Sequence, residues 1–213
     1  GGAVSPPAEA PEGSAATSGR GAGPVSDPVR RRTAAVVLGA LLVHGLLAAW
    51  LPGFIDRDAW FHTRLAALLA SGDAPWHGLR FPWLAHSAYA DLPMDWSWLW
   101  HWALAPLVAT LGAVAGLKAL AALQAALLAG AFHHLLARAG VKGAVAWTAL
   151  LVAGSGEWLY RIHFGRPTPL LLALLLLVLH LALTRRDRAA GGVAALSLLV
   201  YQVPAPLLLV AGA

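Results

Sequence analysis

Two carboxylates, Asp56 and Asp58, come directly after the first long apolar run of the chain. Ionisable groups at the edge of such a run are costly unless they bind something, so they are the first candidates for a functional site. A carboxylate in this position acts as a general base or holds a divalent cation such as Mg²⁺ or Mn²⁺. We expect Asp58 to carry the chemistry, as base or cation ligand, with Asp56 as its helper.

The same residues also suit plainer roles. Residues 58–71 have the pattern of an amphipathic helix. Asp58 or Asp56 could simply cap the start of this helix, because Asp is a favoured N-cap residue. His62 follows Asp58 by one turn, where it orients the carboxylate, ligates a metal or hydrogen-bonds water. Arg64 either binds an anionic group of the substrate, or only pairs with Asp58. The sequence leaves these alternatives open.

Cationic and aromatic residues further along the chain complete the candidate site. Arg161 and Arg166 are suited to bind an anionic group of a substrate. Both also fit a plainer role as charges that flank an apolar run. Glu157 is either a second catalytic acid or a solvated residue. Trp96 and Trp100 belong to a Trp-rich stretch that stacks on sugar rings, or anchors the chain at a membrane interface.

The composition is that of a membrane protein. The chain has 213 residues, of which 59% are hydrophobic and 12% charged, whereas soluble domains average about 25% charged residues. Apolar runs near 20 residues recur, which predicts an all-α, polytopic bundle of transmembrane helices in a lipid bilayer. The net charge of +5 lies mostly in Arg clusters beside apolar runs. Such clusters orient a membrane protein and do not indicate nucleic-acid binding.

The charge pattern predicts a topology. Residues 1–32, rich in Pro, Gly and Ser and ending in three arginines, are expected to form a disordered cytoplasmic tail. Residues 33–213 form the transmembrane domain, which we expect to be truncated at its C-terminus. If 96–114 stays outside as an interfacial or re-entrant helix, the later basic clusters all fall in the cytoplasm. The predicted spans are then 33–54, 117–136, 144–160, 169–184 and 189–213, with an outer loop over 55–116.

One short segment resembles a known family. Asp58-Ala59-Trp60-Phe61-His62-Thr63-Arg64 is similar to Asp-Pro-Trp-Phe-Asn-Tyr-Arg of the oligosaccharyltransferase catalytic subunit, and occupies the same place after the first span. That subunit belongs to the GT-C superfamily of membrane glycosyltransferases. A looser match follows at 161–168, where Arg161 and Gly165 fit. The acidic pair of the family is absent there, and Glu157 is the only acid nearby.

The resemblance implies a function. A GT-C-like enzyme transfers a sugar from a polyprenyl-phosphate-linked donor to an acceptor on the non-cytoplasmic side, here in a bacterial plasma membrane. Asp58 then activates the acceptor, while Arg161, Arg166 and Arg64 stabilise the leaving phosphate. Two other functions remain open, a non-catalytic scaffold or assembly subunit and a fragment of a transporter.

Overall fold

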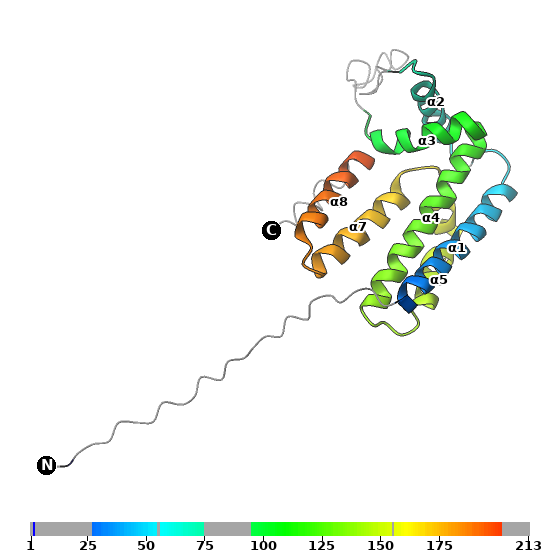
Figure 1. Cartoon of the computed structure of the whole chain (residues 1–213). Helices are drawn as coiled ribbons and strands as arrows, with labels where there is room; N and C mark the ends of the chain where they lie inside the picture. Colours follow the sequence, from blue (N-terminus) through cyan, green and yellow to red (C-terminus); the bar gives the residue numbers. More distant parts are fainter. Residues whose placement is uncertain (1, 3–26, 55, 75–94, 155, 202–213) are drawn as a thin grey trace.

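The computed structural model describes residues 2, 27–54, 56–74, 95–154 and 156–201 (Figure 1). These residues form helices and no strand, so the predicted all-α class is confirmed. Most of the predicted tail, residues 75–94 of the outer loop and residues 202–213 of the last predicted span lie outside the described residues. The helices are α1 (Asp27–Trp50), α2 (Asp58–Ser71), α3 (Trp98–Leu111), α4 (Ala113–Arg138), α5 (Ala144–Ala153), α6 (Gly156–Ile162), α7 (Thr168–Leu183) and α8 (Asp187–Val200).

Among the described residues, two helices are long and apolar enough to cross a membrane. They are Pro28–Trp50, with 23 residues, and Ala113–Arg138, with 26 residues. At about 1.5 Å per residue both exceed the roughly 30 Å of a hydrocarbon layer. The apolar helices α5 and α7 are shorter. The predicted run over 144–160 is divided between α5 and α6, because Gly154 and Gly156 flank the junction and glycine disfavours helix interiors.

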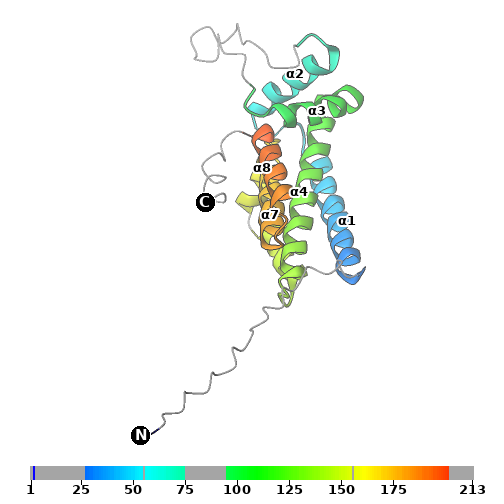
Figure 2. The ribbon, with the colours of Figure 1, turned by 60° about the vertical axis from the view of Figure 1, so that its left-hand side comes forward.

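Helix α4 lies at the centre of the bundle, between α1 and α7 (Figures 1 and 2). Its buried positions are mostly small residues, among them Ala122, Ala126 and Ala129. At Gly130 the two helices lie so close that a Cβ atom would overlap Cγ2 of Val37 on α1. Small side chains therefore let α1 and α4 pack closely along their length.

Helices α2 and α3 lie across one end of this bundle (Figures 1 and 2). Gly112, with a φ of 82°, makes the sharp turn between α3 and α4 that this arrangement needs. A cluster of buried apolar side chains forms where α2 and α3 pack on α4, and it includes Leu65, Leu104 and Leu120. A separate helix across the end of the bundle is what the predicted interfacial position of 96–114 requires, although its place in a membrane stays a prediction.

Basic side chains gather at the other end of the bundle. The start of α1, the end of α4 and the α7–α8 turn all lie there, away from α2 and α3 (Figures 1 and 2). Acidic and basic residues are instead mixed at the end that carries α2. The basic residues of the opposite end are Arg30, Arg31, Arg32, Arg138, Lys142, Arg185, Arg186 and Arg188.

Candidate functional site

Asp56 organises the start of α2. Its Oδ1 accepts a hydrogen bond from the backbone N–H of Asp58 at 3.2 Å, and its carbonyl accepts one from Ala59 at 3.2 Å. Asp56, rather than Asp58, therefore makes the side-chain contact that begins the helix. Asp58 lies in the first turn, where the helix dipole favours a negative charge.

Both carboxylates bind one guanidinium group. Nε and Nη2 of Arg166 lie 2.9 Å and 2.8 Å from Oδ2 of Asp56, and the same Nη2 lies 2.7 Å from Oδ2 of Asp58. The exposed fractions of the three side chains differ, with Asp56 at 14%, Arg166 at 44% and Asp58 at 58%. Asp56 is thus the more buried and more firmly held carboxylate, and Asp58 the more accessible one.

Partial burial acts to lower the pKa of Arg166, but the hydrogen bond with Asp56 and the charges of Asp56 and Asp58 outweigh it and raise that pKa. The guanidinium also lies over the ring of Phe164, 5.5 Å from its centroid. Arg166 is therefore fully charged and held in one place by three neighbouring groups.

Gly165 positions Arg166. Its φ of 68° belongs to the left-handed region, which glycine adopts without strain. A Cβ atom at this position would lie 2.6 Å from Cδ2 of Leu117, near the start of α4. Only glycine lets the turn between α6 and α7 lie this close to α4 while carrying Arg166 to the start of α2.

A cavity of about 130 Å³ lies beside Arg166, and Arg161 also lines it. Its other walls are Trp158, Ile162, Phe164, Thr168 and Pro169. A single water needs roughly 10–15 Å³ measured in this way, so the cavity has room for a group of phosphate size. Arg161 is also bound by Glu157 at 2.9 Å, in an ion pair whose side chains are 64% and 66% exposed. Such an exposed pair is weak and leaves Arg161 able to turn towards an anion.

His62 contacts a histidine on α3. Its Nδ1 lies 2.7 Å from Nε2 of His101, and Nδ1 of His101 lies 2.7 Å from Oδ2 of Asp95. The sequence reasoning missed Asp95 and His101. A signal for both was present, because Asp95 two residues before Ser97 is a helix-start pattern that places His101 in the first turns of α3.

The remaining predicted residues lie in different surroundings. Arg64 is exposed on α2, and the cationic partner of Asp58 is Arg166 rather than Arg64. Trp96 is 41% exposed before the start of α3. Trp100 is fully buried and donates a hydrogen bond from Nε1 to Oε1 of Gln124 at 3.2 Å. Its ring is thus part of the core and has no surface on which a sugar could stack.

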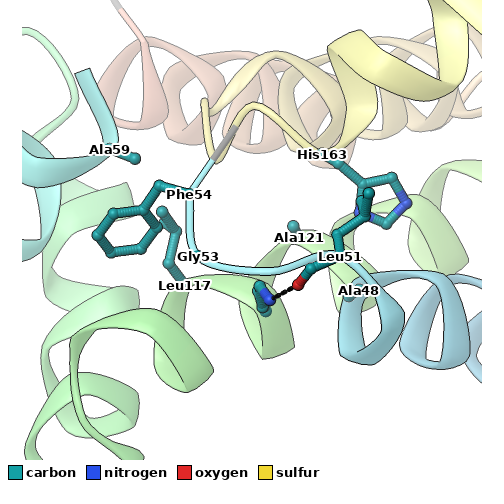
Figure 3. Close-up of a pocket in the computed structure, with 9 residues that line it drawn as sticks. Ala48, Leu51, Gly53, Phe54, Ala59, Leu117, Ala121 and His163 are labelled. Carbon is teal, nitrogen blue, oxygen red and sulfur yellow. Dashed lines mark hydrogen bonds between the residues drawn. The ribbon is translucent and has the colours of Figure 1, made fainter. Parts of the chain in front are cut away.

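A second, much smaller pocket lies at the connection between α1 and α2 (Figure 3). Its volume is about 10 Å³, near the lower limit for one water molecule. Lys118 lines it and donates a hydrogen bond to the carbonyl oxygen of Leu51, drawn as the dashed line in Figure 3. This pocket is too small for a substrate, and its polar contact instead secures the end of α1.

The carboxylate pair does not fit a divalent cation as it is arranged here. Within the residues described, no group of three His, Asp or Glu side chains is placed to hold a metal ion. A cation bound at Oδ2 of Asp56 and Asp58 would have to displace the guanidinium of Arg166. The predicted Mg²⁺ or Mn²⁺ therefore stays a prediction, and no step below depends on it.

In the part of the chain that the structure describes, fold and site together define a class of protein. It is an all-helical bundle with two helices long enough to span a membrane, and it carries an arginine-bridged pair of carboxylates at one end. No family model, curated protein or solved structure matches this chain. The likeness of residues 58–64 to the oligosaccharyltransferase subunit accordingly remains a prediction from the sequence.

Proposed function

We propose that the chain is an integral, multi-pass membrane protein whose N-terminus is cytoplasmic. The surface of α1 supports this, because Leu38, Leu42 and Leu46 follow one another at one-turn spacing and are 66%, 63% and 63% exposed. Burying one such side chain contributes about 1.5–3 kcal/mol, so a lipid environment stabilises this face strongly. The basic end described above is the cytoplasmic end by the positive-inside rule. The α2–α3 end then faces outward.

We further propose that the protein acts there as a glycosyltransferase with a polyprenyl-phosphate-linked sugar donor. The observation that carries this proposal is that Arg166 joins Asp56 and Asp58 beside a cavity that Arg161 also lines. Acceptor activation needs a carboxylate, and the departing phosphate needs cations within reach of the same point. The start of α2 supplies the carboxylate, and the arginines that line the cavity supply the cations.

The geometry suggests how the parts work. The donor phosphate enters the cavity and takes the Nη2 group of Arg166 from Asp58, whose single contact is easily exchanged. Asp56 keeps its two contacts and holds the guanidinium in place. Asp58, now free, accepts the proton of the acceptor as the acceptor attacks the anomeric carbon. The bond from that carbon to the phosphate oxygen breaks, and the phosphate leaves with the electron pair, stabilised by Arg161 and Arg166.

A non-catalytic scaffold is the second candidate function. One observation favours it, namely that Arg166 forms ion pairs with both carboxylates. In a scaffold this ion pair would simply fasten the α6–α7 turn to the start of α2.

The test is transfer from a labelled polyprenyl-phosphate sugar by the full chain in membranes, comparing wild type with Asp58→Asn. Asp73→Asn is the matched control, because Asp73 lies near the other end of α2 and is bound there by Ser71. We expect at least about a 100-fold loss in Asp58→Asn, the usual effect of removing a general base, and none in the control. Equal transfer by both variants would refute the role of Asp58, and no transfer by wild type with several donors would favour the scaffold.

A further inference from the structure

A chain of three ionisable side chains joins α2 to α3. Asp95 accepts hydrogen bonds from the backbone N–H of Ser97 at 2.9 Å and from Nδ1 of His101 at 2.7 Å. Nε2 of His101 lies 2.7 Å from Nδ1 of His62. The side chains of His101 and Asp95 are only 2% and 6% exposed. Both inner members of the chain are thus shielded from water, and only His62 lies at its outer end.

The hydrogen bonds limit where the protons can be. Because Asp95 is an acceptor, Nδ1 of His101 carries a proton. One proton then lies between His101 and His62. Before a further proton is taken up it is bound to Nδ1 of His62, because on His101 it would leave His62 as an imidazolate anion. The nitrogen left over at the end of the chain is then Nε2 of His62. A proton taken up there moves the shared proton onto His101, so that the positive charge comes to lie against the Asp95 carboxylate.

The electrostatics of His62 agree with this direction of transfer. Burial and the charge of His101 lower its pKa to about 3, and Arg166 acts the same way, while Asp95 and Asp56 act to raise it. His62 itself is therefore neutral at pH 7. One step further in, the ring of His101 contacts the Asp95 carboxylate, so a proton that moves onto His101 comes to lie beside a negative charge.

We propose that Asp95, His101 and His62 form a proton relay, which takes the acceptor's proton from Asp58 during the transfer reaction. This rests on the proposed function. Asp58 and His62 lie one turn apart on α2, a spacing that brings Cβ atoms within about 5–6 Å. The proton passes from the Asp58 carboxyl to Nε2 of His62, directly or through one water, and the shared proton moves to His101. Asp58 is thereby restored as a carboxylate and can again bind Arg166.

The alternative is that these hydrogen bonds only fasten α2 to α3. A packing role predicts a loss of stability in any variant that weakens this contact, with no change in the pH profile. Leu65→Val serves as the control for it, because Leu65 is a buried, apolar residue of α2 with no part in the site.

The first measurement is ¹⁵N NMR of the histidine side chains in the full chain, reconstituted in lipid nanodiscs, as a function of pH. If the three groups are coupled, Asp95→Asn lowers the pKa of His62 further and His101→Gln raises it. These opposite shifts follow from the opposite effects of the two charges on His62. A pKa of His62 that is the same in both variants would overturn the relay, whatever the enzyme does.

The second measurement is the pH profile of transfer. We expect Asp95→Asn and His62→Gln to lower kcat by about 100-fold and to change the pH dependence, whereas Leu65→Val leaves the pH dependence as it is. If the NMR shifts are coupled but the pH profile of transfer is unchanged, the relay has no role in catalysis, while Asp58 can still be the base. Coupled shifts without any transfer by wild type would overturn the proposed function, and with it the catalytic part of the relay.

Discussion

The bridge between Arg166 and the two aspartates is the contact most open to a quantitative test. Since Nη2 of Arg166 lies 2.8 Å from Oδ2 of Asp56 and 2.7 Å from Oδ2 of Asp58, these two oxygens are at most 5.5 Å apart. With a dielectric constant between that of a protein surface and that of water, two charges at this distance repel by about 0.8–3 kcal/mol. Arg166→Gln removes the positive charge and leaves this repulsion uncompensated.

The two ion pairs should differ in strength. Asp56 is 14% exposed and is bound by two nitrogens, whereas Asp58 is 58% exposed and is bound by one. In double-mutant cycles we expect a coupling energy of about 1–2 kcal/mol between Arg166 and Asp56. For Arg166 and Asp58 we expect less than about 1 kcal/mol, because water screens an exposed pair.

The assay is reversible unfolding of the full chain in mixed detergent micelles, followed by fluorescence of its ten tryptophans. The cycles use Arg166→Gln with Asp56→Asn and with Asp58→Asn, at low and at high salt. The exposed pair of Glu157 and Arg161 is an internal reference, with an expected coupling of about 0.3–0.5 kcal/mol. A coupling of Arg166 to Asp56 that does not exceed this reference would show that the bridge is absent in solution.

Three more predictions, with four variants, test the structure around the site. Gly165→Ala should lower the free energy of unfolding by about 1–3 kcal/mol and abolish the coupling of Arg166 to the two aspartates. Its control is Gly140→Ala, which should show backbone strain alone, because Gly140 has a φ of 73° but open space around it. Equal behaviour of the two variants would mean that the contact with Leu117 is unimportant. Because the pKa of His62 falls to about 3 on folding, the unfolded chain binds a proton that the folded one does not. Stability should therefore fall by about 1.4 kcal/mol per unit as the pH drops from 6 to 4, and His62→Gln should remove that part of the slope in urea titrations. Trp100→Ala should cost about 3–5 kcal/mol in the same unfolding assay; a loss below 1 kcal/mol would contradict its place in the core.

The helices could largely be predicted from the sequence, because long apolar runs leave few alternatives to helix. The predicted spans over 117–136 and 169–184 overlap closely with α4 and α7. Helix ends were less predictable. The break between α5 and α6 depends on two glycines inside an apolar run, and such a run favours one continuous helix when hydropathy alone is considered.

The Trp-rich stretch shows the limit of reading a pattern without its neighbours. Trp98, Trp100 and Trp102 alternate along the sequence, which suggests one shared role at an interface. In a helix, residues four apart share a face, whereas the residue midway between them points the other way. Trp98 and Trp102 accordingly contact each other, with ring centroids 6.4 Å apart, while Trp100 enters the core.

By itself the sequence determined the all-helical class and identified Asp56, Asp58 and Arg166 as candidates, since charge beside an apolar run is costly and visible in composition. It did not determine their partners. Spacing along a helix relates only residues three or four apart, whereas Arg64 follows Asp58 by six, so a pairing of these two stayed an open alternative. The tertiary structure selected Arg166 instead, from 108 residues away, because Gly165 allows its turn to lie against α4. The chain of Asp95, His101 and His62 likewise arises only when α3 packs on α2.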